Sequence, residues 1–164
     1  MHIRKLLLSV ILLGIFALVI VLLYNNAQKK DQEKNALSTV YSSLTDGSWS
    51  TDGTWSPVGI PIGSDDITIN NNVTSTSSFV LFGTLNINAT AILTIKSLEV
   101  KSGAFINVYG TLNVEDLTFD NGSHVHYFAG SFANISNDFH NKNNSDDVVF
   151  DGAENVLGEV TNGN

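Results

Sequence analysis

From Gly47 to the C-terminus, apolar and polar residues alternate in short triplets of the type apolar–polar–apolar. Successive side chains of a β-strand point to opposite faces of a sheet, so this period of two predicts short strands with one apolar face. Residues that favour turns, mainly Gly, Asn and Asp, separate the triplets. The pattern predicts an all-β domain with strands at residues 67–69, 85–87, 93–95, 98–100, 106–108, 112–114, 117–119, 125–127 and 148–150.

Two internal similarities narrow the choice of all-β architecture. Residues 82–88 (FGTLNIN) recur as residues 109–115 (YGTLNVE), and residues 103–109 (GAFINVY) align with residues 122–128 (GSHVHYF). The two offsets, 27 and 19 residues, lie within the range of stacked solenoid coils. We therefore expect a short right-handed β-solenoid of about four to six coils, in which each strand pairs with the strand one coil above. A β-sandwich is the alternative.

The first 24 residues contain an apolar run that is long enough to cross a membrane. Residues 6–24 (LLLSVILLGIFALVIVLLY) carry no charge. A helix of this length, at ~1.5 Å per residue, spans ~28 Å and so matches the hydrocarbon layer. A cleaved signal peptide is the competing interpretation, but its cleavage site needs small residues where Asn25-Asn26-Ala27 has asparagine. We expect residues 1–24 to be an uncleaved single-pass anchor.

A helical stalk is expected between the anchor and the β domain, over residues 25–46. Leu37, Val40, Tyr41 and Leu44 follow the i, i+3, i+4, i+7 spacing of an apolar helical stripe. The turn-forming sequence at residues 46–48 ends this pattern, so the β-solenoid is expected to occupy residues 47–164. The alternative for residues 25–46 is a flexible linker.

The charge of the chain argues against one class of ligand. From Asn35 onward there are three lysines, no arginine and fourteen carboxylates, which give a formal charge of −11. Binding of nucleic acid requires cationic side chains that replace the phosphate counterions, so we expect no nucleic-acid partner. The chain has no cysteine, which excludes disulfides and thiolate metal ligands. The acidic, Asn- and Thr-rich surface favours a location outside the cytoplasm, in the periplasm or at the cell surface.

Two stretches resemble a class of bacterial repeat regions. Residues 47–56 (GSWSTDGTWS) and 59–74 (GIPIGSDDITINNNVT) supply two tryptophans, a proline, and aspartate before a strand rich in Val and Ile. This order resembles the opening of β-helical repeat regions in secreted surface proteins of Bacteroidetes-type bacteria and, more loosely, of the G8 domain. Residues 148–158 (VVFDGAENVLG) are similar to a late segment of those regions. The resemblance implies a β-helical fold and an adhesive, structural or polysaccharide-associated role.

Trp49 and Trp55 are candidates for contact with a sugar. Two indole rings side by side would form a platform on which a sugar ring could stack. Large aromatic side chains near the start of a solenoid can instead cover its open end, which otherwise exposes the core. We favour the covering role.

Two histidines lie where a metal site would need them. His124 and His126 are two residues apart on a predicted strand, so both side chains project to one face. Alignment with Phe105 and Asn107 places that face on the outside. The sequence places no third ligand beside them, and His140 is only a candidate.

Acidic clusters in predicted turns are the other candidate ligands, in this case for calcium. None of them matches a defined calcium-binding loop, so solvated turn carboxylates are the favoured interpretation. We therefore predict no metal site, no cofactor and no catalytic residue. The clusters are Asp65-Asp66, Asp116 with Asp120, and Asp146-Asp147 with Asp151.

These observations predict a membrane-anchored, extracytoplasmic structural or adhesive module that contacts an envelope protein or a surface glycan, and not an enzyme. The alternative is a subunit of a pilin-like filament or larger membrane assembly, because an apolar N-terminal helix before a β domain is the pilin-like layout. No processing site of the pilin type is found around Gly14.

The C-terminal end of the predicted solenoid carries apolar residues with little to shield them. Only residues 158–164 follow this apolar stretch, and an unpaired strand edge beside apolar side chains is a template for another chain. We expect a partner subunit or a second copy to cover this end. The residues concerned are Val148, Val149, Phe150, Val156 and Leu157.

Overall fold

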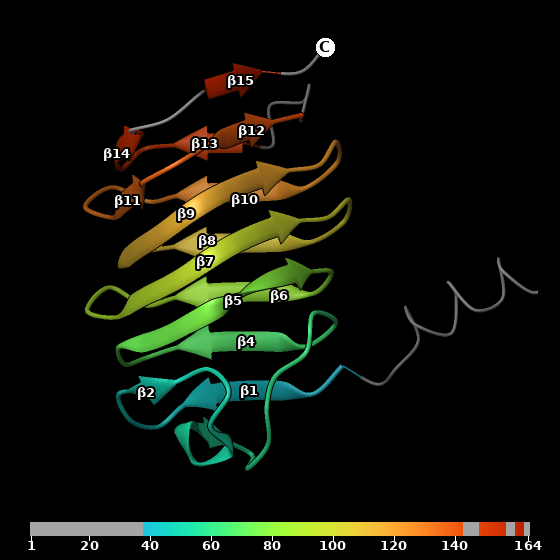
Figure 1. Ribbon diagram of the computed structural model, residues 1–164, viewed down its shortest axis with the longest axis vertical. Helices are drawn as coiled ribbons and strands as arrows, with labels where there is room; N and C mark the ends of the chain where they lie inside the picture. The colour runs from blue at the N-terminus through green and yellow to red at the C-terminus, as the bar shows by residue number, and fades with distance from the viewer. Residues whose placement is uncertain (1–37, 143–147, 157–159, 163–164) are drawn as a thin grey trace, which may run out of the picture. The chain divides into compact units, whose positions relative to one another are not determined.

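The computed structural model describes residues 38–142, 148–156 and 160–162, which form short β-strands and one single-turn 3-10 helix, η1 (Asp52–Thr54). The strands lie in two sheets (Figure 1). The first has the order β13-β10-β8-β6-β4-β1-β3. Its strands are β1 (Val40–Ser43), β3 (Trp55–Ser56), β4 (Asp66–Ile69), β6 (Thr84–Ile87), β8 (Phe105–Val108), β10 (His124–Tyr127) and β13 (Val148–Phe150).

The second sheet has the order β14-β11-β9-β7-β5-β2, and β12 pairs with both β9 and β15 beside it. Its strands are β2 (Gly47–Ser48), β5 (Val73–Leu81), β7 (Ile92–Val100), β9 (Thr111–Phe119), β11 (Phe132–Ile135), β12 (Phe139–Asn141), β14 (Ala153–Val156) and β15 (Val160–Asn162). Every pairing in both sheets is parallel except that of β1 with β3.

From β4 to β11, successive strands alternate between the two sheets, and each pairs with the strand one coil away. This arrangement is a β-solenoid of about four turns, so the predicted all-β solenoid is confirmed and the β-sandwich is excluded. With the N-terminal coil below, the chain runs right along the near strands β5, β7 and β9. It runs left along β4, β6 and β8 behind them as it climbs, which is a right-handed winding (Figure 1).

The two sequence repeats have different structural meanings. His124 stacks in register on Phe105, so the offset of 19 residues is a true coil. Residues 84–87 and 111–114, related by the offset of 27, lie in different sheets and do not stack, so that alignment was wrong as a coil length. The glycine that both segments share, Gly83 or Gly110, has the same structural reason in each: a Cβ there would lie less than 2.5 Å from a backbone oxygen of the preceding coil.

The apolar members of the triplets fill a narrow core shared by all coils. Their polar partners face outward and are bonded from coil to coil: Asn107 Nδ2 donates to Asn86 Oδ1 (2.9 Å) in the first sheet. In the second sheet, Asn113 Nδ2 donates to Thr94 Oγ1 (3.3 Å). The fully buried large side chains include Ile67, Ile69, Leu81, Leu85, Ile87, Leu93, Leu98, Ile106, Leu112 and Phe119.

The long strands of the second sheet change face in their middle. In β7, Leu93 and Ile95 are buried, and the next buried residue is Leu98, not residue 97. Two consecutive residues therefore point away from the core, and the same shift occurs in β9 at residues 115–116. A strand can keep apolar residues inward across such a shift only by bending, so each coil turns a corner here.

The predicted helical stalk is wrong for residues 38–46, which are the part of it that the structure describes. Val40–Ser43 is strand β1, which pairs in register with residues 66–68 of β4, so the solenoid begins before Gly47. β-Branched and serine residues form helices poorly, and pairing with β4 satisfies backbone groups along a complete strand. The apolar spacing was misleading, because Val40 and Leu44 are exposed and only Tyr41 packs inward, against Trp55.

Residues 1–37 lie outside the described part of the chain, and with them the predicted anchor and most of the stalk. Leu157, Asp146 and Asp147 also lie outside it, as does the side chain of Val156. Within residues 38–142, 148–156 and 160–162, no helix has both the length and the apolar character needed to cross a bilayer.

Candidate functional site: a polar groove along the bend of the long strands

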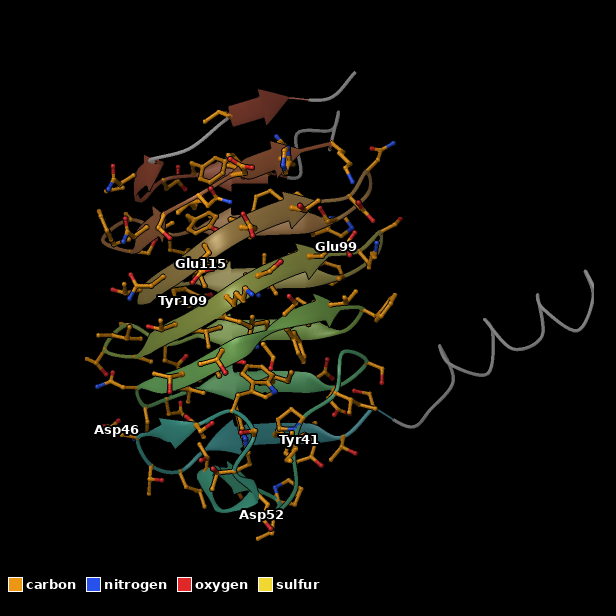
Figure 2. All side chains as sticks on the ribbon, in the orientation of Figure 1. Tyr41, Asp46, Asp52, Glu99, Tyr109 and Glu115 are labelled. Carbon is orange, nitrogen blue, oxygen red and sulfur yellow. The ribbon has the colours of Figure 1, made fainter. Side chains whose placement is uncertain are left out.

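The bend of the second sheet forms a groove of about 540 Å³ that runs along the stack. Equivalent positions of β5, β7, β9 and β11 contribute to its walls, so it crosses four coils. Glu115, which lies on β9 near the middle of the stack, is one of the residues that line the groove (Figure 2). The lining residues are Thr74, Ser75, Thr76, Thr94, Ile95, Lys96, Asn113, Val114, Glu115, Asn134 and Ser136.

One wall of the groove is a row of hydroxyl and amide side chains. Thr74 is in register with Thr94, Thr94 with Asn113, and Asn113 with Asn134. Paired strands are ~4.8 Å apart, so the row presents hydrogen-bonding groups at that repeat. Hydroxyl and amide groups both donate and accept, which matches a ligand that itself carries groups of both kinds.

The opposite wall carries the two charged side chains of the groove. Lys96 of β7 and Glu115 of β9 are exposed and occupy equivalent positions on adjacent coils. The other two lysines of the described chain are in ion pairs, whereas Lys96 has no carboxylate within salt-bridge distance among the residues described. Ile95 and Val114, whose side chains are almost completely buried, lie between the two walls and form an apolar floor.

A cluster of charges lies in the turns beyond the second half of the long strands. Lys101 Nζ contacts the carboxylates of Glu99 and Asp120 (2.9 Å to Asp120 Oδ2), and Lys142 Nζ lies 3.5 Å from Asp120 Oδ1. The hydrogen bond to Glu99, and then that to Asp120, raise the pKa of Lys101. Burial acts to raise the pKa of Asp120, but the hydrogen bond and charge of Lys101, together with Lys142, hold it below its usual value. These ions are paired with each other and join three coils.

The tryptophans form a cap, and the covering role predicted for them is confirmed. Trp55 is fully buried and Trp49 nearly so, and β3, which contains Trp55, ends the first sheet. Trp55 Nε1 donates to Trp49 O (2.9 Å), and Trp49 Nε1 donates to Pro61 O (3.3 Å). Trp49 also packs on Phe79, with ring centroids 4.5 Å apart. Neither indole presents a face for a sugar.

The histidines lie on the outer face as predicted, but within an aromatic stack. His124 stacks on Phe105, and His126 on Phe128, with ring centroids 4.4 and 3.7 Å apart. His126 Nε2 is 3.0 Å from Asp151 Oδ2. His140 is in β12 of the other sheet and is not brought to them. In the described chain, no three side chains of His, Asp or Glu are grouped as metal ligands.

The acidic residues predicted for turns are engaged in several separate contacts. Asp65 is buried and accepts hydrogen bonds from Thr39 N (3.0 Å) and Ile62 N (2.8 Å), which fastens the cap loop to the first coil. Asp116 accepts a hydrogen bond from Asn137 Nδ2 of the next coil. Asp66 is the first residue of β4. The carboxylates of Asp65 and Asp116 hold coils and loops together, and the described acidic residues are not grouped as metal ligands.

The groove itself was not among the sites predicted from the sequence. Thr94 and Asn113 were expected as polar members of predicted strands, but residues 74–76, 134 and 136 lay in no predicted strand, and the bend that forms the groove was missed. The signal was present, because the buried positions step by three from Ile95 to Leu98 and from Val114 to Leu117 where a straight strand steps by two.

No protein-family model matches the chain, and neither a curated protein nor a solved structure is similar enough to count as a match.

Proposed function

We propose that the protein is a membrane-anchored, extracytoplasmic structural and adhesive module whose groove binds an extended glycan. The observation that carries the proposal is the groove itself, with one wall formed by Thr74, Thr94, Asn113 and Asn134 in register over four coils. A regular row of neutral donors and acceptors suits a ligand with repeating hydroxyl groups. The uncharged run at residues 6–24 would hold the module at the membrane.

The charge of the groove and of the chain supports a neutral or weakly charged glycan over other polymers. A nucleic acid would meet one lysine in the groove and a strongly acidic domain around it. Glycoside hydrolysis usually requires two carboxylates that face each other across the scissile bond. Glu115 is the one carboxylate that lines the groove in the described part of the chain, and we propose binding without catalysis.

The affinity of one module is expected to be low. Among the described residues, no aromatic ring lines the groove, so stacking that would strengthen sugar binding is not supplied by them and hydrogen bonds must compete with water. We expect a Kd of roughly 0.1–1 mM, or about −4 to −5.5 kcal/mol. Many copies displayed on one membrane would raise the effective affinity for a repetitive glycan.

The test compares two asparagines with matched chemistry. Asn113→Ala removes a groove amide that bonds Thr94, whereas Asn107→Ala removes an amide that bonds Asn86 on the first sheet, outside the groove. Oligosaccharides that bind the full-length protein on a glycan array would be titrated against both variants by NMR. We expect Asn113→Ala to weaken binding at least about five-fold and Asn107→Ala to leave it unchanged. Equal losses, or binding to no glycan, would refute the proposal.

A second candidate function, as a subunit of a larger assembly, is favoured by the C-terminal end. Each sheet finishes there in a strand, β13 or β14, that has a partner on one side only among the residues described, and β15 pairs only with β12. Phe150 is partly exposed, and Val160 on β15 is exposed. The N-terminal end is instead closed by the tryptophan cap. We propose that a second copy or another subunit adds its strands at the open end.

Oligomeric state tests this second function. Val160→Lys places a charge on the exposed β15, and Val40→Lys places the same charge on the exposed face of β1 in the first coil. Light scattering of the purified full-length protein in detergent should show association that Val160→Lys reduces and Val40→Lys does not. A wild-type protein that is a monomer, without co-purifying protein, would contradict this candidate.

A further inference from the structure

One strip of the cap exposes its aliphatic side chains and buries the other side. Val58, Ile60 and Ile62 are 77%, 47% and 57% exposed, while the intervening Gly59 is partly buried and Pro61 is buried. The strip belongs to no strand, and its backbone bends at residues 57–59. Branched aliphatic side chains are usually buried, but those of the strip point to solvent.

The inner side of this cap strip (residues 58–62) is fastened to the first coil. Pro61 O accepts the hydrogen bond of Trp49 Nε1, and Ile62 N donates to Asp65 Oδ2. Gly59 lies against the Tyr41 hydroxyl, which a Cβ at this position would approach to 2.8 Å. These contacts hold the strip so that its aliphatic side chains remain outside the core.

The cap strip lies beside the point where the chain enters the solenoid. The two oxygens of Asp65 bind Ile62 N and Thr39 N, so the strip and the start of the first coil share one carboxylate. Two further exposed apolar residues, Val40 and Leu44, belong to the same end. The apolar run that ends at Tyr24 is separated from Ser38 by residues 25–37, which can reach at most about 45 Å. If residues 6–24 cross a membrane, this end is kept near it.

We propose that the cap strip lies in the interfacial layer of the membrane, with Val58, Ile60 and Ile62 at the boundary between headgroups and acyl chains. Residues 56–64 carry no charge in an otherwise acidic domain, so the strip can approach anionic lipid with little repulsion. Residues 25–37 contain three lysines and two carboxylates, a net charge of +1, so this segment adds no repulsion from such a surface. Exposed aliphatic residues gain by leaving water for the acyl boundary. The inference rests on the proposed anchor and adds a second membrane contact.

The chain contains no cysteine, so single labels can be placed without altering other residues. Val58→Cys carries an environment-sensitive fluorophore on the cap strip. Phe132→Cys, in β11 and 40% exposed, is the control, because β11 lies three strands away from β5 in the second sheet and far from the cap. Both full-length variants are incorporated into vesicles of phosphatidylethanolamine and phosphatidylglycerol. Flotation, quenching by aqueous iodide and quenching by lipids with a shallow nitroxide are then measured.

We expect the label at residue 58 to shift to the blue, to lose at least about half of its iodide quenching and to be quenched by the nitroxide lipid. The label at residue 132 should stay accessible to iodide. If the vesicles float with the protein but residue 58 stays accessible to iodide, the inference is overturned and the anchor stands. If residue 58 is shielded from iodide without nitroxide quenching, a protein contact covers the strip and the inference is also overturned. Protein that does not float would overturn the anchor itself.

Discussion

At Gly110 the backbone passes directly over the coil below it. A Cβ at this position would lie 2.2 Å from Asn88 O and 2.4 Å from Ala91 O, and both are backbone atoms that no rotamer change can move. Gly83 is in the same situation above Asp65 O. The constraint at these two residues is close approach, because neither adopts a positive φ.

Gly110→Ala should therefore destabilise the protein by roughly 2 kcal/mol or more, because the new methyl group pushes two coils apart. Gly53→Ala is the control, since a Cβ at Gly53 meets nothing within 4 Å, and it should change stability by no more than about 0.5 kcal/mol. Urea denaturation followed by circular dichroism measures both. Similar midpoints for the two variants would contradict the close-approach argument.

A second prediction concerns the Lys101–Asp120 ion pair and the pH dependence of the stability that it contributes. The pKa of Asp120 is lower in the folded protein than its usual value, so its stabilising effect is present above the unfolded pKa and is lost as the pH falls through the folded pKa. Asp120→Asn should cost about 0.5–1 kcal/mol at pH 7. The difference from wild type should shrink as the pH falls below about 4. A difference that stays constant from pH 7 to pH 2.5 would show that the charge is not its cause.

The long strands β5, β7 and β9 are the elements that shape both core and groove. The same bend that keeps Leu93, Ile95 and Leu98 inward turns Lys96 outward to the groove wall. The groove therefore depends on the packing beneath it. Most residues that line the groove belong to strands and not to loops, which favours a rigid surface.

Two neighbouring residues of β7 test the inward and outward assignment. Leu93 is fully buried and Ile92 is exposed at the strand's start. Leu93→Ala should cost about 2–5 kcal/mol because it leaves a cavity in the core, whereas Ile92→Ala should cost less than about 1 kcal/mol. Thermal and urea unfolding would measure the difference. A larger loss for Ile92→Ala than for Leu93→Ala would invalidate the burial pattern.

On the scale of the whole molecule, the solenoid is nearly one-dimensional, since each coil contacts only its neighbours. Its two ends differ: the tryptophan cap closes the first coil, while Phe150 in the last packs on Tyr127 (centroids 4.9 Å apart) and Phe139. Both tryptophans belong to the cap, so their fluorescence reports on that end alone. Stability in such stacks is a sum of local and neighbour terms, and the two ends can loosen separately.

Phe150→Ala should therefore increase amide hydrogen exchange in β12, β13 and β14 while leaving β4, β6 and tryptophan emission unchanged. Phe105→Ala, which truncates an exposed ring of the outer stack, is the control and should leave exchange at the C-terminal end unaltered. Exchange that rises equally in all coils would mean that the solenoid unfolds as one cooperative unit.

Much of the fold could be read from the chain because a period of two records which side chains face inward. The triplets at residues 67–69, 85–87 and 106–108 lie in the predicted strands with the predicted faces. The outward placement of His124 and His126 and the burial of the tryptophans were likewise predicted. These features are local, since each depends on alternation within a few residues.

The sequence alone thus determined where many of the strands lie, which of their side chains face inward, and the acidic character of the surface. Each of these features depends on residue types and their alternation along a short stretch of chain. Tertiary structure decided which segments stack. Residues 82–88 and 109–115 are alike in sequence yet lie in different sheets, and β1 became a strand only because β4 offers its backbone as a partner. It also decided the groove, since a row that includes Thr94 and Asn113 exists only when separate coils lie in register. Backbone pairing between coils joins residues about twenty positions apart, which no local pattern specifies.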